Sequence, residues 1–117
     1  MTIIGKEFTF AAAHSLPLMP EGHKCRRLHG HTYRVEIRLA GELDTLGMVA
    51  DFSTIEAAWR PLHAILDHQH LNTIDGLETP TAENVAAFIM DGVSDMLPLL
   101  ESVRVWESPT SWAEVVR

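Results

Sequence analysis

Residues 29–40 constrain the fold of this chain more than any other stretch, because their side chains alternate almost without a break. The odd positions are His29, His31, Tyr33, Val35, Ile37 and Leu39, and the even positions are Gly30, Thr32, Arg34, Glu36, Arg38 and Ala40. Successive side chains of a β-strand point to opposite faces of the sheet. The pattern therefore predicts a strand with a buried face and a polar face, and it places both histidines on the buried face.

A second strand is predicted over residues 3–13, where Phe8, Phe10 and Ala12 share one face. His14 falls on the same face if the strand continues by one residue. A loop with two prolines and a glycine follows. We expect the two strands to pair antiparallel across this loop, which brings His14 to the side of the sheet that carries His29 and His31.

Two helices are predicted in the middle of the chain. Ser53 and Glu56 form a capping-box pattern at the start of the first, which runs to about Leu66 with Pro61 inside it. Thr81 is the predicted N-cap of the second helix, and Pro98 is expected to end it. The remaining predicted strands cover residues 102–108 and 111–116, with 48–52 either a short strand or an extended approach to the first helix.

Strands at both ends and helices between them predict an α+β fold, an antiparallel sheet with both helices on one face, in a single domain over residues 1–117. The net charge of −7 argues against a general surface for nucleic acid or an anionic membrane. No apolar run is long enough for a bilayer, and the N-terminus lacks the order of a secretion signal. Cys25 is the only cysteine, so no internal disulfide forms and a reducing cytoplasm is the expected compartment.

His14, His29 and His31 are the candidate metal ligands. Three protein ligands with one open position are typical of a catalytic zinc rather than a structural one. Imidazole also suits copper, iron or nickel, so Zn²⁺ is favoured by its availability and by the tetrahedral count. The alternative is that each histidine is a core residue bonded to the backbone, which for His14 alone is the simpler interpretation.

Cys25 lies four residues before His29, and two different roles fit it. As a fourth ligand it would close the metal site, and as a nearby thiolate it would act as a base. Its basic neighbours Lys24, Arg26 and Arg27 favour the thiolate, and they also form a patch that suits an anion such as phosphate or a solvated loop. An inert, partly buried cysteine is the third alternative.

Asp67, His68 and Glu107 are the remaining candidates. Asp67 and His68 form either a carboxylate–imidazole proton relay or a polar loop in which Asp67 caps a helix end. Glu107 continues the apolar face of a strand, so its carboxylate lies at the wet end of that strand or accepts from paired N–H groups of a ligand. His23, His63 and His70 receive no role.

These residues together resemble the 6-carboxy-tetrahydropterin synthase / 6-pyruvoyl-tetrahydropterin synthase family. The likeness covers nearly the whole chain, and the spacing Cys-x-x-x-His-Gly-His with an upstream His and a downstream Asp-His is highly specific. It is carried by Phe8–His14, Glu21–His31, Leu66–His68, Pro80–Asn84 and Val105–Glu107.

The resemblance implies a T-fold, in which a four-stranded antiparallel sheet carries two helices on one side. It implies a homohexamer in which two three-subunit barrels stack, with active sites between subunits. The polar face of Arg34, Glu36 and Arg38 would then line the lumen. The implied substrate is the pterin 7,8-dihydroneopterin triphosphate.

The family's roles fall on matching positions of this chain. His14, His29 and His31 would bind Zn²⁺, Cys25 would be the general base, and Asp67 with His68 would be its relay partners from a neighbouring subunit. Glu107 would anchor the pterin ring. A bound dication would acidify the substrate's side-chain hydroxyls.

Two branches of the family remain to be separated. The short spacing between Cys25 and His29 resembles the carboxy branch of queuosine biosynthesis, which makes 6-carboxy-5,6,7,8-tetrahydropterin and releases acetaldehyde and triphosphate. Gln69-His70, where an aromatic often follows, and Ser108, where threonine is common, depart from the family pattern without touching a chemical role. The alternatives are a 6-pyruvoyl-tetrahydropterin synthase reaction and a non-catalytic pterin- or zinc-binding assembly protein.

Overall fold

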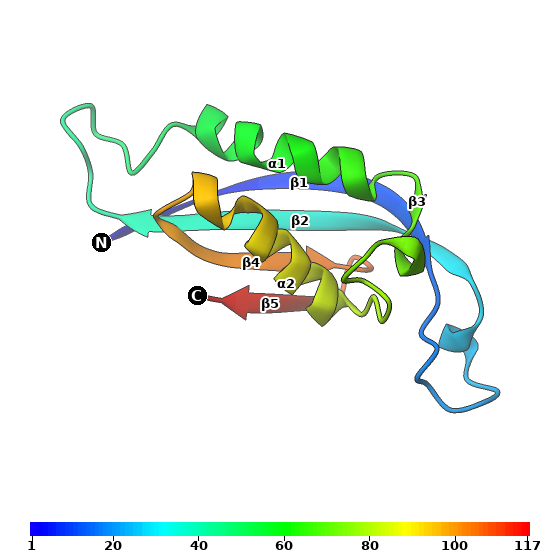
Figure 1. The fold of residues 1–117 in the computed structure, drawn as a ribbon. Helices are drawn as coiled ribbons and strands as arrows, with labels where there is room; N and C mark the ends of the chain where they lie inside the picture. The colour runs from blue at the N-terminus through cyan, green and yellow to red at the C-terminus, as the bar shows by residue number, and fades with distance from the viewer.

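The computed structural model describes residues 1–117 as one open β-sheet with two long helices packed against one of its faces (Figure 1). The strand order is β3-β1-β2-β4-β5. The strands are β1 (Thr2–His14), β2 (His29–Gly41), β3 (Gln69–His70), β4 (Leu100–Trp106) and β5 (Trp112–Val116). The helices are α1 (Phe52–Leu66) and α2 (Ala82–Val93), with single 3-10 turns at Lys24–Arg26, Leu71–Thr73 and Ser94–Met96.

The two long strands at the centre confirm the alternation in the sequence. β1 and β2 pair antiparallel over their full length, with Phe10 opposite Tyr33 and His14 opposite His29. Directly opposed residues point to the same face of a sheet. The aromatic pair stacks with its ring centroids 4.7 Å apart in the core, and the histidine pair continues that face at the end of the strands.

The expected four-stranded antiparallel sheet is wrong in one respect, because the sheet has five strands and is mixed. β3 pairs parallel with β1, through Ala12–Gln69 and Ala13–His70. A strand of two residues leaves no alternation to detect in a sequence. Residues 48–52 form no strand, because Asp44 accepts hydrogen bonds from the N–H groups of Leu46 (2.8 Å) and Met48 (3.1 Å) and folds this stretch into a loop.

The helices begin close to the predicted positions, but the cap of α1 differs. Asp51 is its N-cap and accepts from the Ser53 N–H at 2.8 Å, so the capping box of Ser53 and Glu56 does not form. Pro61 lies inside an unbroken helix on its exposed side, where the carbonyl freed by the missing N–H can meet water. Thr81 caps α2 as predicted.

The C-terminal end of α2 comes earlier than expected. The helix ends at Val93, and a 3-10 turn separates it from Pro98. A proline lacks an N–H group and disfavours helical geometry at the residue before it. It therefore sets an outer limit for a helix but does not specify the residue at which the helix ends.

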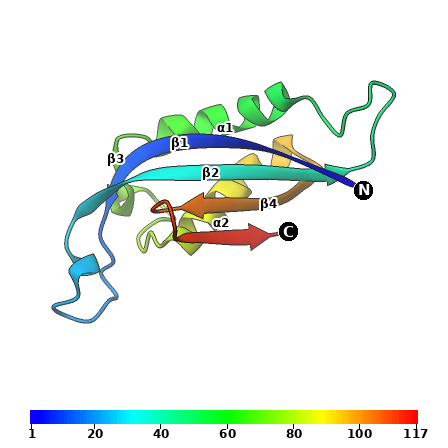
Figure 2. The same ribbon diagram turned by 180° about the vertical axis from the view of Figure 1, so that it is seen from behind.

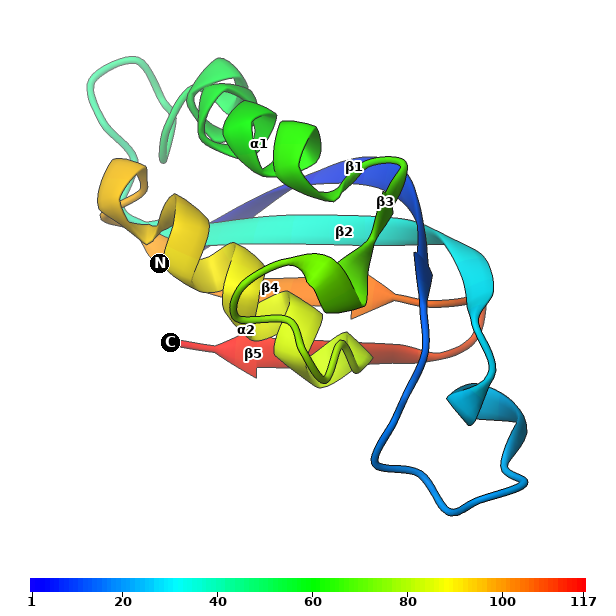
Figure 3. The same ribbon diagram turned by 45° about the vertical axis from the view of Figure 1, so that its right-hand side comes forward.

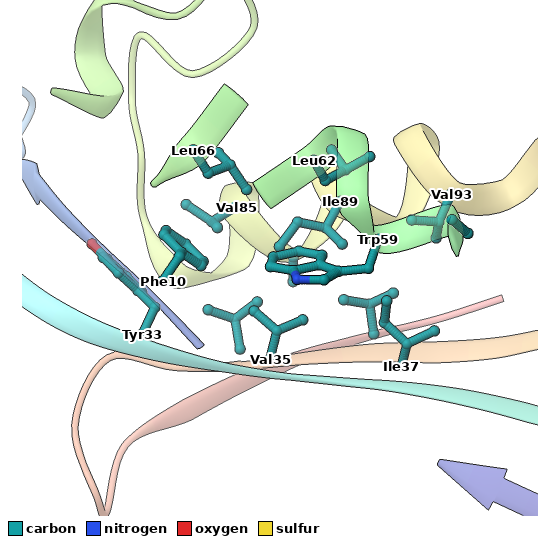
Figure 4. Close-up of a cluster of buried hydrophobic side chains, with 14 of the residues drawn as sticks. Phe10, Tyr33, Val35, Ile37, Trp59, Leu62, Leu66, Val85, Ile89 and Val93 are labelled. Carbon is teal, nitrogen blue, oxygen red and sulfur yellow. The ribbon is translucent and has the colours of Figure 1, made fainter. Parts of the chain in front are cut away.

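The hydrophobic core fills the space between the sheet and the two helices. α1 packs over β1, and α2 packs over β4 and β5. Figure 4 shows Trp59 of α1 lying between the helices and the Val35 and Ile37 side chains of β2. The core is a continuous cluster of 22 buried residues.

The opposite face of the sheet has no helix over it (Figure 2). Arg34, Arg38 and Arg104 lie on this face, where Arg104 pairs with Glu114 at 3.3 Å and Arg34 stacks over the Trp106 ring at 3.8 Å. The sheet is open at β5 and along most of β1. None of the helices has the length and apolar character that a bilayer span requires.

Candidate active site

Three imidazoles converge where β1 ends and β2 begins. His14, His29 and His31 each offer one ring nitrogen, and the three nitrogens lie within 4.8 Å of one another. The antiparallel register supplies this geometry, since it places His14 opposite His29 and Ala12 opposite His31 on one face. The predicted cluster therefore forms, and Cys25 is not part of it.

Backbone carbonyls orient two of the three rings. The Nδ1 atom of His14 lies 2.8 Å from the Pro80 carbonyl oxygen, and Nδ1 of His29 lies 2.7 Å from that of Arg27. A carbonyl oxygen only accepts, so both Nδ1 atoms carry the hydrogen and both Nε2 atoms carry lone pairs in the neutral rings. These two Nε2 atoms are 3.0 Å apart, so both lone pairs could point at one bound cation.

The burial of the cluster suits metal ligands. His14 is 1% exposed. Desolvation by burial lowers the pKa of His14 and of His31 below the usual value, although the Glu107 carboxylate opposes this shift. Neutral imidazole is the form that binds a metal ion, and at such sites the other ring nitrogen commonly donates to a carbonyl, which fixes the tautomer. The donor set therefore fits a divalent metal ion with a free coordination position.

Cys25 and Glu107 share one cavity with the histidines. The cavity has a volume of about 410 Å³, and its lining consists of His14, Leu16, Lys24, Cys25, His29, His31 and Glu107. Part of its wall comes from the loop of residues 15–28, which Figure 3 shows extending past the end of the sheet. The thiol thus lies in the same cavity as the cluster without joining its three ligands.

Cys25 is held by the loop around it. The 3-10 turn at Lys24–Arg26 begins at His23, whose Nδ1 accepts from the Cys25 N–H at 3.0 Å. The Cys25 carbonyl accepts from the Leu16 N–H at 2.7 Å. His23, which received no role from the sequence, therefore caps the turn that carries the thiol.

Glu107 follows the last residue of β4. Its N–H donates to the Ser111 carbonyl at 3.1 Å, which holds the turn between β4 and β5. The half-buried side chain also borders a second hollow of about 700 Å³ with Arg34 and Trp106. Glu107 thus lies between two open spaces, where its carboxylate oxygens are available to a ligand.

The Asp67–His68 pair forms, but in a different place. Asp67 Oδ2 accepts from His68 Nδ1 at 2.7 Å, and Asp67 Oδ1 accepts from the Ala11 N–H at 2.9 Å. His68 borders a third hollow, of about 600 Å³, which His31 also lines and Cys25 does not. His68 adopts a left-handed backbone (φ 59°) and its side chain is 80% exposed, so the ring faces outward from its own chain.

Asn72 is a supporting residue that sequence reasoning missed. Its amide accepts from the Ser15 N–H at 3.0 Å and donates to the Ser15 carbonyl at 2.9 Å. Both polar groups of the residue after His14 are thereby satisfied by one side chain. Its partner lies 57 positions away, and no local pattern relates the two.

Comparison with known proteins assigns the chain to a family. A model of the 6-pyruvoyl tetrahydropterin synthase family matches residues 3–117. The chain belongs to this family. The family predicted from the sequence motifs is therefore confirmed.

Two curated relatives of this family member carry the same name. The chain is 48% identical to the 6-carboxy-5,6,7,8-tetrahydropterin synthase of Synechocystis sp., over 97% of this chain and 92% of that protein. It is 38% identical to the Bacillus subtilis protein of that name, over 93% and 81%. The Caenorhabditis elegans 6-pyruvoyl tetrahydropterin synthase structure superposes with a TM-score of 0.90 at 24% identity, covering 99% of this chain and 95% of that one, which shows the shared fold.

Proposed function

We propose that this chain is a zinc-dependent 6-carboxy-5,6,7,8-tetrahydropterin synthase, a carbon–carbon lyase. It would convert 7,8-dihydroneopterin triphosphate to 6-carboxy-5,6,7,8-tetrahydropterin and release acetaldehyde and triphosphate. The observation that carries the proposal is one cavity holding three convergent imidazoles, a thiol and a carboxylate. The names of the Synechocystis and Bacillus relatives support this reaction over the other branch of the family.

In this proposal His14, His29 and His31 hold Zn²⁺ through the nitrogens that face one another. The bound ion would supply Lewis acidity to the hydroxyls of the substrate side chain. The chain's contribution is to fix the ring orientations through the carbonyls of Pro80 and Arg27. It also leaves room beside the cluster for the substrate.

Cys25 and Glu107 would act on the substrate itself. Cys25 Sγ is the proposed general base that removes a proton, and it lies in the same cavity as Lys24 and the histidine cluster. The two carboxylate oxygens of Glu107 would accept from the paired N–H groups at one edge of the pterin ring. Both residues line the cavity of the histidine cluster, as this division of roles requires.

The placement of Asp67 and His68 leads us to propose that each site is completed by a neighbouring subunit. Within one chain His68 borders a hollow that Cys25 does not line, and the His68 side chain is exposed. The open edges at β1 and β5 allow neighbouring sheets to pair, and the uncovered polar face would then line a lumen. We propose a homohexamer of two stacked trimers that acts in cytoplasmic queuosine biosynthesis.

The test is product identification by mass spectrometry with pure, zinc-loaded protein and 7,8-dihydroneopterin triphosphate. We expect 6-carboxy-5,6,7,8-tetrahydropterin and acetaldehyde. A 6-pyruvoyl product would assign the chain to the other reaction of the family, and unchanged substrate would contradict both. The Cys25→Ala variant should lose activity and keep its zinc, whereas loss of zinc would make Cys25 a fourth ligand of a closed, non-catalytic site.

A further inference from the structure

The Asp67 carboxylate has a second imidazole beside it that the proposed chemistry does not use. Oδ2 of Asp67 accepts from Nδ1 of His68 at 2.7 Å and lies 3.7 Å from Nε2 of His63. Oδ1 is occupied by the Ala11 N–H. One carboxylate oxygen therefore faces two imidazoles, one from helix α1 and one from the turn that follows it.

Helix α1 holds His63 in this position. The spacing of four residues puts it one turn before Asp67, whose N–H donates to the His63 carbonyl at 2.9 Å. The His63 ring meets the buried Trp59 ring edge-on, with centroids 6.1 Å apart, and Trp59 stacks on Phe8 at 5.2 Å. This packing holds one side of the ring. Because the side chain is 44% exposed, the ring can still exchange protons with water.

Asp67 is the only ion-pair partner of His63. The other charged residues near it are Glu56 and Arg60, which line a small groove beside it on the same helix. From β1, the Lys6 amino group lies 5.9 Å from the centre of the Phe8 ring that borders this groove. The protonation of His63 therefore acts chiefly on Asp67 and, through it, on His68.

We propose that His63 is a positioning residue that adjusts the proton affinity of His68 through the carboxylate they share. The inference rests on the proposed function, in which Asp67 and His68 form the proton relay. When His63 is neutral, the charge of Asp67 acts on His68 alone. When His63 gains a proton, it pairs with the same oxygen and disfavours a second positive charge on His68, so the two rings titrate as a coupled pair.

The first test follows the His68 ring by NMR in protein labelled with ¹³C-histidine, with His68→Gln used to assign its resonance. In His63→Gln, we expect the titration midpoint of His68 to rise by about half a pH unit, because a nearby positive charge is lost. Arg60→Gln is the matched control, since it removes a positive charge from the same helix without touching Asp67. An equal rise in Arg60→Gln, or none in His63→Gln, would overturn the proposal.

A double-mutant cycle isolates the role of the carboxylate. In an Asp67→Asn background, His63→Gln should leave the His68 midpoint unmoved, because the shared charge is gone. A shift of the same size in that background would show that His63 acts without Asp67 and would overturn the proposal. These measurements need no turnover, so they remain decisive if the protein fails to act on 7,8-dihydroneopterin triphosphate.

The enzymatic arm measures the pH profile of kcat/KM. The limb that belongs to His68 should move to higher pH in His63→Gln by the amount seen in the NMR titration. His63→Phe, which keeps the ring packing against Trp59, should show the same movement. A uniform loss of activity at every pH without movement of the limb would indicate a purely structural role and would contradict the proposal.

Discussion

At the scale of single residues, two backbone carbonyls decide which nitrogens the histidine cluster presents. The carbonyl oxygens of Pro80 and Arg27 accept hydrogen bonds from Nδ1 of His14 and His29, respectively. The Nε2 atoms of these two rings therefore face each other. Two such lone pairs at 3.0 Å repel each other, and a bound metal ion would relieve that repulsion. Burial, in turn, disfavours protonation of His14 and His31.

The stability of the metal-free protein should therefore depend on pH. Burial lowers the folded-state pKa of His14 and His31 below 6.5, so the unfolded chain binds more protons as the pH falls through 6.5. We expect the free energy of unfolding of chelator-treated protein, measured in urea, to decrease from pH 7.5 to pH 5.5. His14→Gln should show a shallower decrease, and an unchanged slope in this variant would contradict the explanation.

The Asn72 amide should contribute to stability through Ser15. Asn72→Ala leaves two partly buried backbone groups without their partner, so we expect a loss of about 1–3 kcal/mol in urea unfolding. Gln69→Ala, a change to an exposed amide nearby, is the control and should be close to neutral. A similar effect in both variants would show that the hydrogen bonds between Asn72 and Ser15 are not the cause.

At the scale of elements, the close contact between the two helices depends on one glycine. A Cβ at Gly92 of α2 would lie 2.7 Å from Leu62 Cδ1 and 2.9 Å from Leu62 Cδ2. Leu62 is 4% exposed and packed in the core, so it has little room to withdraw. Gly92 thus sets how near α2 can come to α1, which in turn positions both helices over the sheet.

Gly92→Ala should destabilise the protein although alanine is the better helix former. Overpacking costs about 1–3 kcal/mol and helix propensity returns about 1 kcal/mol, so we expect a net loss of about 1 kcal/mol in urea unfolding. In a Leu62→Ala background the same change should become stabilising, because the clash is gone. Gly5→Ala, where the new Cβ makes ordinary contacts from 3.5 Å, is the control, and destabilisation in both backgrounds would refute the contact.

At the scale of the whole molecule, one chain divides the proposed catalytic groups between two places. Cys25, Glu107 and the histidine cluster share one cavity, and His68 borders another, which has His31 in common with the first. The outward-facing His68 ring and the open sheet edges are the features by which a second chain would complete the site. This arrangement is testable by mixing inactive variants.

Cys25→Ala and His68→Ala should each be inactive alone and active when refolded together. If every site takes Cys25 from one subunit and His68 from its neighbour, random mixing of equal amounts leaves roughly a quarter of the sites with both residues. The mixture should then show about that fraction of the wild-type activity. The measurement is acetaldehyde release from 7,8-dihydroneopterin triphosphate by the mixture. A mixture as inactive as its parts would show that each site is completed within one chain.

The residue pattern was sufficient to predict the two long strands, the two helices and the histidine cluster. Alternation along 29–40 specified β2 and its buried face, and the same parity placed His14, His29 and His31 on one face, because a pairing that buries both apolar faces fixes the side to which the three rings point. The N-cap of α2 at Thr81 could also be predicted from the sequence. These features depend on short-range geometry that a residue pattern records directly.

Contacts between segments that are far apart in the sequence could be found only in the folded structure. The Asn72 clamp on Ser15, the Pro80 carbonyl on His14 and the parallel pairing of β3 join segments more than fifty residues apart. The separation of Cys25 from Asp67 and His68 is of the same kind. Such contacts depend on how whole elements pack in space, and no local periodicity encodes the distance between two elements that are remote in the chain.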